Sequence, residues 1–152
     1  YDELLSGYSM NALDILNDAL FDVEYDQMVV VKGIDFYSLC EHHMLPFYGK
    51  THVGYLPNKK VIGLSKVPRL VEMFARRLQV QERMTQEIAA TIDELVSPKG
   101  VGVVIEAHHL CASMRGIGKP GIIMTTSAVR GTFKTNSSTR DEFMSHLSGA
   151  IG

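Results

Sequence analysis

The spacing of hydrophobic residues along the chain alternates between the period of a strand and the period of a helix. Residues Met28–Cys40 and about Tyr48–Leu56 are rich in β-branched and aromatic side chains. They predict two strands of an antiparallel pair, with residues 42–46 in the connection. Two further strands are predicted over Val101–Cys111 and Gly121–Phe133, joined by a glycine-rich segment.

Helical spacing fills the intervals between these strands. Apolar residues share one face of residues 9–21, and Ser9 is a suitable N-cap. A second helix is expected to begin after Ser65, and a third to end at residues 97–100, where Ser-Pro-Lys-Gly follows the last apolar position. A short helix from about Thr139 to Leu147 is expected near the end of the chain.

The predicted order is therefore helix, two strands, two helices, two strands, helix. Separate runs of strands and helices are typical of α+β folds with an antiparallel sheet, and not of doubly wound α/β folds. We expect a four-stranded antiparallel sheet with the two central helices packed on one face, together with N- and C-terminal helices.

Composition limits the class of protein. With 152 residues, 45% of them hydrophobic and 21% charged, the chain suits one domain over residues 1–152. The net charge of −2 does not indicate a nucleic-acid binder, and no apolar run reaches the roughly 18 residues of a membrane span. No signal peptide is visible, and we expect a cytoplasmic protein. The chain opens at Tyr1 in a helical pattern, so we expect an N-terminal helical segment before it.

Each of the two cysteines stands beside a histidine pair, in Cys-Glu-His-His at 40–43 and in His-His-Leu-Cys at 108–111. A catalytic zinc ion keeps three protein ligands, commonly thiolate or imidazole, and an open position for water. Cys40 and His43 have the Cys-x-x-His spacing that can close on one ion, and Cys111 can supply the third ligand if the two strand pairs meet. The pattern predicts a zinc site.

Two alternatives to this three-ligand site remain. A closed site with two cysteines and two histidines would use His42 or His109 as the fourth ligand. His109 and Cys111 are two residues apart on a predicted strand, an awkward separation for binding one small ion but a natural one for a ligand and an acid–base group. The other alternative is that both cysteines are buried, inert thiols.

The sequence motifs of several other enzyme classes are absent or interrupted in this chain. The chain lacks the His-Glu-x-x-His of zincin proteases and the Pro-Cys-x-x-Cys of zinc deaminases. A Gly-x-Gly-x-x-Gly sequence occurs at 116–121, but Pro120 interrupts it and a strand-like segment follows where dinucleotide binding requires a helix. No Walker A sequence is present, which excludes a P-loop GTPase.

A hydroxyl and two cations, from Ser65, Lys66 and Arg69, surround the expected start of the second helix. Free backbone N–H groups and the helix dipole favour phosphate there, and Arg115 could bring a third cation to the same pocket. The alternative is a solvated first turn with ordinary surface charges.

Gln81 and Glu82 fall at the junction of the two central helices. A carboxylate can accept two hydrogen bonds from the N1–H and 2-amino edge of guanine, which would make Glu82 a base-recognition residue. An exposed glutamate in a first helical turn is otherwise only a solvated charge.

Four segments resemble the signature sequences of type I GTP cyclohydrolases. They are Cys-Glu-His-His at 40–43, Gly-Leu-Ser-Lys at 63–66, Gln-Val-Gln-Glu-Arg at 79–83 and His-Leu-Cys-x-x-x-Arg at 109–115. The resemblance implies a T-fold, in which antiparallel sheets assemble into barrels, and a homodecamer of two pentamers with active sites shared between subunits. It also implies that GTP and water give formate and 7,8-dihydroneopterin triphosphate, the first step of tetrahydrofolate or tetrahydrobiopterin biosynthesis.

The resemblance also implies a role for each motif residue. Cys40, His43 and Cys111 would bind Zn²⁺, while His42, His109 and Ser65 would handle protons. The remaining residues would bind substrate: Ser65, Lys66, Arg69 and Arg115 at the triphosphate and ribose, and Gln81 with Glu82 at guanine.

Two other functions stay open at this stage. One is a binding or assembly module whose zinc is purely structural, which would not require the cations and Glu82 to converge. The other is a related T-fold enzyme acting on a different pterin or a deazapurine, which the full Cys/His set disfavours.

Overall fold

The computed structural model describes residues 2–17, 19–24, 26–111 and 121–148. Its helices are η1 (Ser6–Ser9), α1 (Ala12–Leu16), α2 (Lys66–Ala75), α3 (Gln81–Val96), α5 (Thr132–Thr135) and α6 (Ser137–Ser148). Its strands are β1 (Leu20–Asp22), β2 (Val29–Cys40), β3 (Pro46–Leu56), β4 (Lys60–Ile62), β5 (Leu78–Gln79), β6 (Gly100–His109) and β7 (Met124–Gly131).

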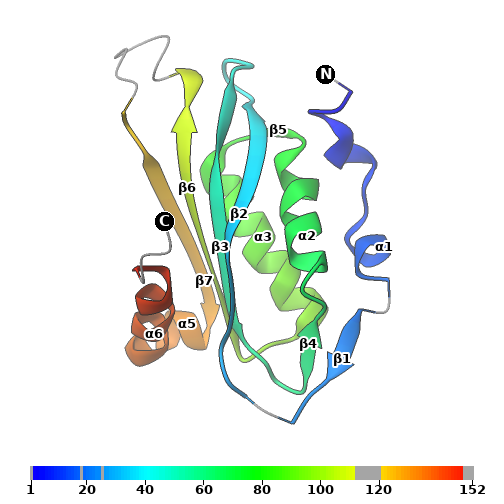
Figure 1. Ribbon diagram of the computed structural model, residues 1–152, viewed down its shortest axis with the longest axis vertical. Coiled ribbons are helices and arrows are strands. Elements are labelled where there is room, and N and C mark those ends of the chain that lie inside the picture. The colour runs from blue at the N-terminus through cyan, green and yellow to red at the C-terminus, as the bar shows by residue number, and fades with distance from the viewer. Residues whose placement is uncertain (1, 18, 25, 112–120, 149–152) are drawn as a thin grey trace.

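The main sheet has the strand order β5-β2-β3-β6-β7 (Figure 1). The four long strands pair antiparallel, so the expected four-stranded sheet is confirmed. The sheet has one strand more than expected. This strand, β5, pairs parallel with the end of β2 and places Gln79 beside Cys40. Because β3 separates β2 from β6 and runs against both, the last residues of β2 and β6 lie at the same end of the sheet.

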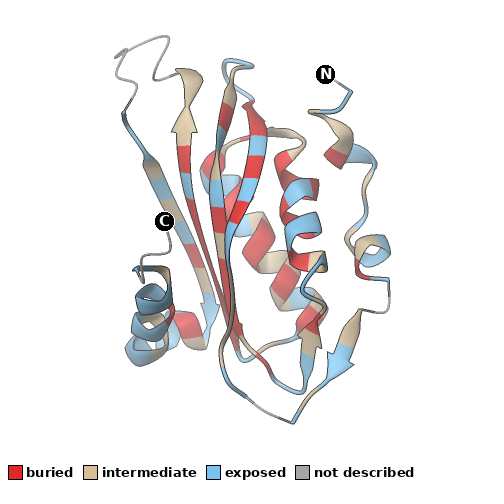
Figure 2. Ribbon diagram, in the orientation of Figure 1, coloured by how far each residue is buried: buried red, intermediate tan, exposed pale blue. Residues whose placement is uncertain are grey.

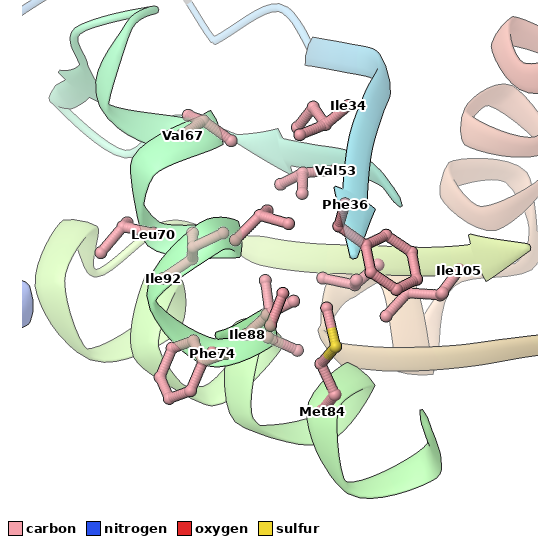
Figure 3. Close-up of a cluster of buried hydrophobic side chains, with 14 of the residues drawn as sticks. Ile34, Phe36, Val53, Val67, Leu70, Phe74, Met84, Ile88, Ile92 and Ile105 are labelled. Carbon is pink, nitrogen blue, oxygen red and sulfur yellow. The ribbon is translucent and has the colours of Figure 1, made fainter. Parts of the chain in front are cut away.

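Helices α2 and α3 cover one face of this sheet, as expected from their apolar stripes (Figure 1). Strand residues that alternate along β2, such as Ile34 and Phe36, point to the same face and meet Leu70 of α2 and Ile88 of α3 in the core (Figure 3). Burying each large apolar side chain is worth about 1.5–3 kcal/mol, so this layer supplies most of the packing. No helix in the described part of the chain is long and apolar enough to span a bilayer.

A smaller cluster on the other face of the sheet joins α6 to the strands. Phe143 of α6 and Phe133 of α5 are buried there, although most of α6 is exposed (Figure 2). They fit because Gly54 and Gly102 are paired neighbours on β3 and β6. A Cβ atom at Gly54 would lie 2.5 Å from a carbon of the Phe143 ring, so a side chain at this position would displace α6.

The N-terminal region differs from the sequence prediction. The helix expected over residues 9–21 is limited to α1, whose N-cap is Asn11 and not Ser9. It ends because Asn17 adopts a left-handed conformation, with φ of 40°. Residues Leu20–Asp22 then form β1, which pairs with β4 in a separate two-stranded sheet.

Candidate functional site

The candidate metal ligands meet at the end of the sheet where β2 and β6 finish. Cys40 is the last residue of β2, His43 lies in the turn that follows, and Cys111 comes two residues after β6. One ligand atom from each residue lies within 4.8 Å of the other two. Cys40 is buried, Cys111 is half-buried and His43 is exposed, so the group opens to the surface on one side.

The donor set of this group fits zinc. Two thiols and one imidazole are the soft and borderline ligands that Zn²⁺ prefers, and three protein ligands are the usual number for a catalytic ion. Among the described residues, His42 and His109 are not part of the group, although both are close to it in sequence. The arrangement therefore suits an open site better than a closed one with two histidines.

His109, the last residue of β6, is held beside this group by two contacts. Its Nε2 lies 2.6 Å from Oε1 of Gln81, and its ring stacks on Phe47 with centroids 4.7 Å apart and planes at 1°. Burial lowers the pKa of His109 from its ordinary value, and the nearby Glu82 carboxylate opposes this shift. Burial thus disfavours the charged form of this imidazole.

Gln81 is almost completely buried, and its amide orientation is determined by its partners. Its Nε2 donates to the carbonyl oxygens of Ile105 and Met124, at 3.2 and 3.0 Å, and lies 3.0 Å from the Thr126 hydroxyl. The amide oxygen must then face His109 and accept a hydrogen bond from its Nε2. These contacts make Gln81 a support for His109, and its contact with guanine stays a prediction.

Glu82 and His42 lie near the group without belonging to it. Glu82 is exposed in the first turn of α3, where its charge acts on His109. His42 is exposed in the turn after β2, with its Nε2 4.0 Å from a carboxylate oxygen of Glu41. Both side chains are open to a bound small molecule.

A charged pair that sequence reasoning missed lies next to the ligands. Arg83 of α3 donates from Nη2 to Oε2 of Glu41 at 2.6 Å. This hydrogen bond lowers the pKa of Glu41 and raises the pKa of Arg83, so both are charged at neutral pH. The two residues are far apart in sequence, and no local pattern signals their contact.

The predicted phosphate ligands that the structure describes, Ser65, Lys66 and Arg69, are not brought to this group within one chain. Ser65 is the N-cap and Lys66 the first residue of α2, which lies between β4 and β5 along the chain and covers part of the length of the sheet (Figure 1). Helix α2 has 10 residues and spans about 15 Å, so its start is far from Cys40. Arg69 is exposed one turn further along α2, and Arg115 lies outside the described residues.

The side chain of Ser65 makes no capping hydrogen bond at the start of α2, although the helix begins where expected. Ser65 and Arg69 are both exposed, and Lys66 is half-buried. The hydroxyl and the two cations therefore lie on a separate, solvent-facing part of the chain at the start of α2, away from the thiols.

Comparison with known proteins identifies close relatives. The family model described as GTP cyclohydrolase I matches residues 1–148. GTP cyclohydrolase 1 of Campylobacter jejuni strain RM1221 is 60% identical over 150 residues, which cover 99% of this chain and 79% of that protein. GTP cyclohydrolase 1 of Wolinella succinogenes is 55% identical over 147 residues, covering 97% of this chain and 79% of that protein.

A solved structure agrees with the fold. The archaeosine synthase QueF-Like in its apo form superposes with a TM-score of 0.59 at 18% identity, covering 71% of this chain and 97% of that chain. At this identity the likeness concerns the fold alone, and it confirms the expected T-fold.

Proposed function

The chain belongs to the GTP cyclohydrolase I family, and we propose that it converts GTP and water to formate and 7,8-dihydroneopterin triphosphate with a zinc ion held by Cys40, His43 and Cys111. One observation carries the proposal. Two thiols and an imidazole converge within 4.8 Å beside a supported histidine, in a chain 60% identical to a GTP cyclohydrolase 1. We place this activity in the cytoplasm.

The metal and the histidines have separate tasks in this proposal. A zinc ion in a site with three protein ligands supplies Lewis-acid activation of water near neutral pH. His109 is the acid–base group at the imidazole ring of guanine, because Gln81 and Phe47 hold its ring in one orientation close to the ligands. Protonating N7 there lets the ring nitrogen leave without becoming an anion. His42, which is exposed, handles protons in the later rearrangement.

The substrate has two ends, which need different chemistry. Glu82 accepts hydrogen bonds from the donor edge of guanine, next to His109. Ser65, Lys66, Arg69 and Arg115 bind the triphosphate and ribose, and Ser65 also assists proton transfer. Since Ser65 and Lys66 lie at the other end of α2 from Cys40, we propose that a neighbouring copy of the chain supplies them, in a decamer of two pentamers.

Formate release tests the function directly. Protein loaded with one equivalent of zinc is expected to release one formate for each GTP consumed, and a chelator should abolish the reaction. A protein that binds zinc but releases no formate above the level of a buffer blank would have a structural metal, and the proposed activity would be wrong.

Glu82→Gln is expected to reduce discrimination between GTP and ITP at least about tenfold. The two substrates differ in the 2-amino group, and a hydrogen bond to a charged acceptor contributes about 1.5–3 kcal/mol. The measurement is the ratio of kcat/KM for GTP to that for ITP. Glu94→Gln, near the other end of α3, is the matched control and should leave this ratio unchanged. An unchanged ratio in Glu82→Gln would make Glu82 only a solvated helix charge.

A further inference from the structure

The turn that carries two of the proposed ligands is tied to the rest of the chain at several points. Within the turn, Met44 N donates to Cys40 O at 2.8 Å and Cys40 N donates to Leu45 O at 2.9 Å. Outside it, Glu41 N donates to Gln79 O of β5 at 2.9 Å. The turn therefore depends on β5, a strand of only two residues, for its backbone support.

Arg83 adds a side-chain connection between the turn and the same strand. Its Nη2 donates to Glu41 Oε2 at 2.6 Å and to Leu78 O at 3.1 Å, and its Nε donates to Gln79 Oε1 at 3.2 Å. One guanidinium thus joins the start of α3, both residues of β5, and the residue between Cys40 and the histidines.

Gln79 explains why the guanidinium has one position. The Gln79 side chain is 1% exposed, and its Nε2 donates to Phe74 O and to Glu87 Oε1, both at 2.9 Å. Its amide nitrogen is committed to these acceptors, so its oxygen must face Arg83. A buried amide therefore orients Arg83, and Arg83 in turn orients Glu41.

We propose that Arg83 and Glu41 are a positioning pair that holds the turn from Cys40 to His43 in the shape that binds the metal ion. Glu41 lies between the two ligands of this turn but is not part of the ligand group in the described residues. The pair acts through the backbone of the turn, without contact with substrate. This inference rests on the proposed zinc site.

Zinc affinity tests the pair independently of catalysis. Glu41→Gln keeps the shape of the side chain and removes its charge, while Arg83→Gln removes the charged guanidinium. Substitutions of groups that support metal ligands typically weaken metal binding about 10–100-fold, and we expect that range for each variant in a competition titration with a chromophoric chelator. The double variant should be no weaker than the weaker single variant, because the two residues act as one unit.

The chain offers a closely matched control. Arg130 and Asp93 form an ion pair at 3.1 Å with side chains 45% and 33% exposed, against 46% and 34% for Arg83 and Glu41. This pair joins β7 to α3 and does not involve the turn that carries Cys40 and His43, so Arg130→Gln should leave zinc affinity unchanged. The visible spectrum of the cobalt(II) form reports ligand geometry, and it should change in Glu41→Gln but not in Arg130→Gln.

The outcomes are distinct. If the zinc dissociation constants of both single variants were within twofold of that of the unsubstituted protein, the positioning role of Arg83 and Glu41 would be wrong. The proposed zinc site would not be affected by this result. Equal weakening by Arg130→Gln would also overturn the positioning role, because the effect would then be general to ion pairs on α3. A parent protein that binds no zinc at one equivalent would overturn the proposed zinc site and the pair together.

Discussion

Cys111→Ser is expected to lose both the bound metal and formate release, the latter by at least about a thousandfold. The thiol lies within 4.8 Å of the other two ligand atoms, and a hydroxyl is a much poorer zinc ligand. The metal contributes several kcal/mol of transition-state stabilisation, and each 1.36 kcal/mol is a factor of about ten in rate. Metal analysis of the purified variant and the formate assay measure the two losses.

The exposed His146 on α6 provides the control for Cys111→Ser. Histidine can bind zinc, but His146 lies on α6 and is not part of the ligand group in the described residues. His146→Ala should therefore keep one equivalent of zinc and full activity. Full zinc occupancy in Cys111→Ser would contradict the assignment of Cys111 as a ligand. Since serine is close to cysteine in size, the variant should fold, which circular dichroism can verify.

His109→Ala should keep its zinc while formate release falls about 10²–10⁴-fold, the usual contribution of a general acid or base. His109 bonds to Gln81 and lies outside the ligand group in the described residues, so its loss removes no donor to the metal. Zinc content and single-turnover formate release, measured on the same preparation, separate the two roles.

His108 is the matched control for His109. It is the preceding residue of β6, so its side chain points to the other face of the sheet, where it stacks on Tyr48 with centroids 5.5 Å apart. His108→Ala should therefore change activity only slightly. If His109→Ala lost zinc in proportion to activity, His109 would be a ligand and the site would be closed.

The main elements of the fold could be predicted because their signals are local. The stripe of Val67, Leu70 and Phe74 predicts α2 without knowledge of its partner, and β-branched runs likewise predict β2 and β6. The short strands β1 and β5 could not be predicted, because pairing with a distant segment makes them strands. Their two or three residues carry no period of their own.

The same difference between local signals and long-range contacts applies to the residues of the candidate site. Cys40 and Cys111 could be placed together because each stands at the end of a predicted strand. The hydrogen bond between Gln81 and His109 could not be predicted from the sequence. It depends on which carbonyl groups of β6 and β7 lie next to the start of α3 and accept from the Gln81 amide nitrogen. Sequence order also does not indicate that α2 ends near β5 and begins about 15 Å away from that end, so that Ser65 and Lys66 lie away from the thiols (Figure 1).

The ligand group joins segments that are adjacent only after folding. Cys40 and Cys111 approach each other because β3 has paired on both sides, with β2 and with β6. An unfolded chain cannot hold the three donors together, so an ion that binds there binds the native state more tightly than the unfolded chain. At one hundred times its dissociation constant, such an ion adds at most about 2.7 kcal/mol to the free energy of unfolding. The unfolding temperature and the resistance to proteolysis would then increase with the concentration of free metal. A chain without its ion would be degraded faster, in addition to being inactive.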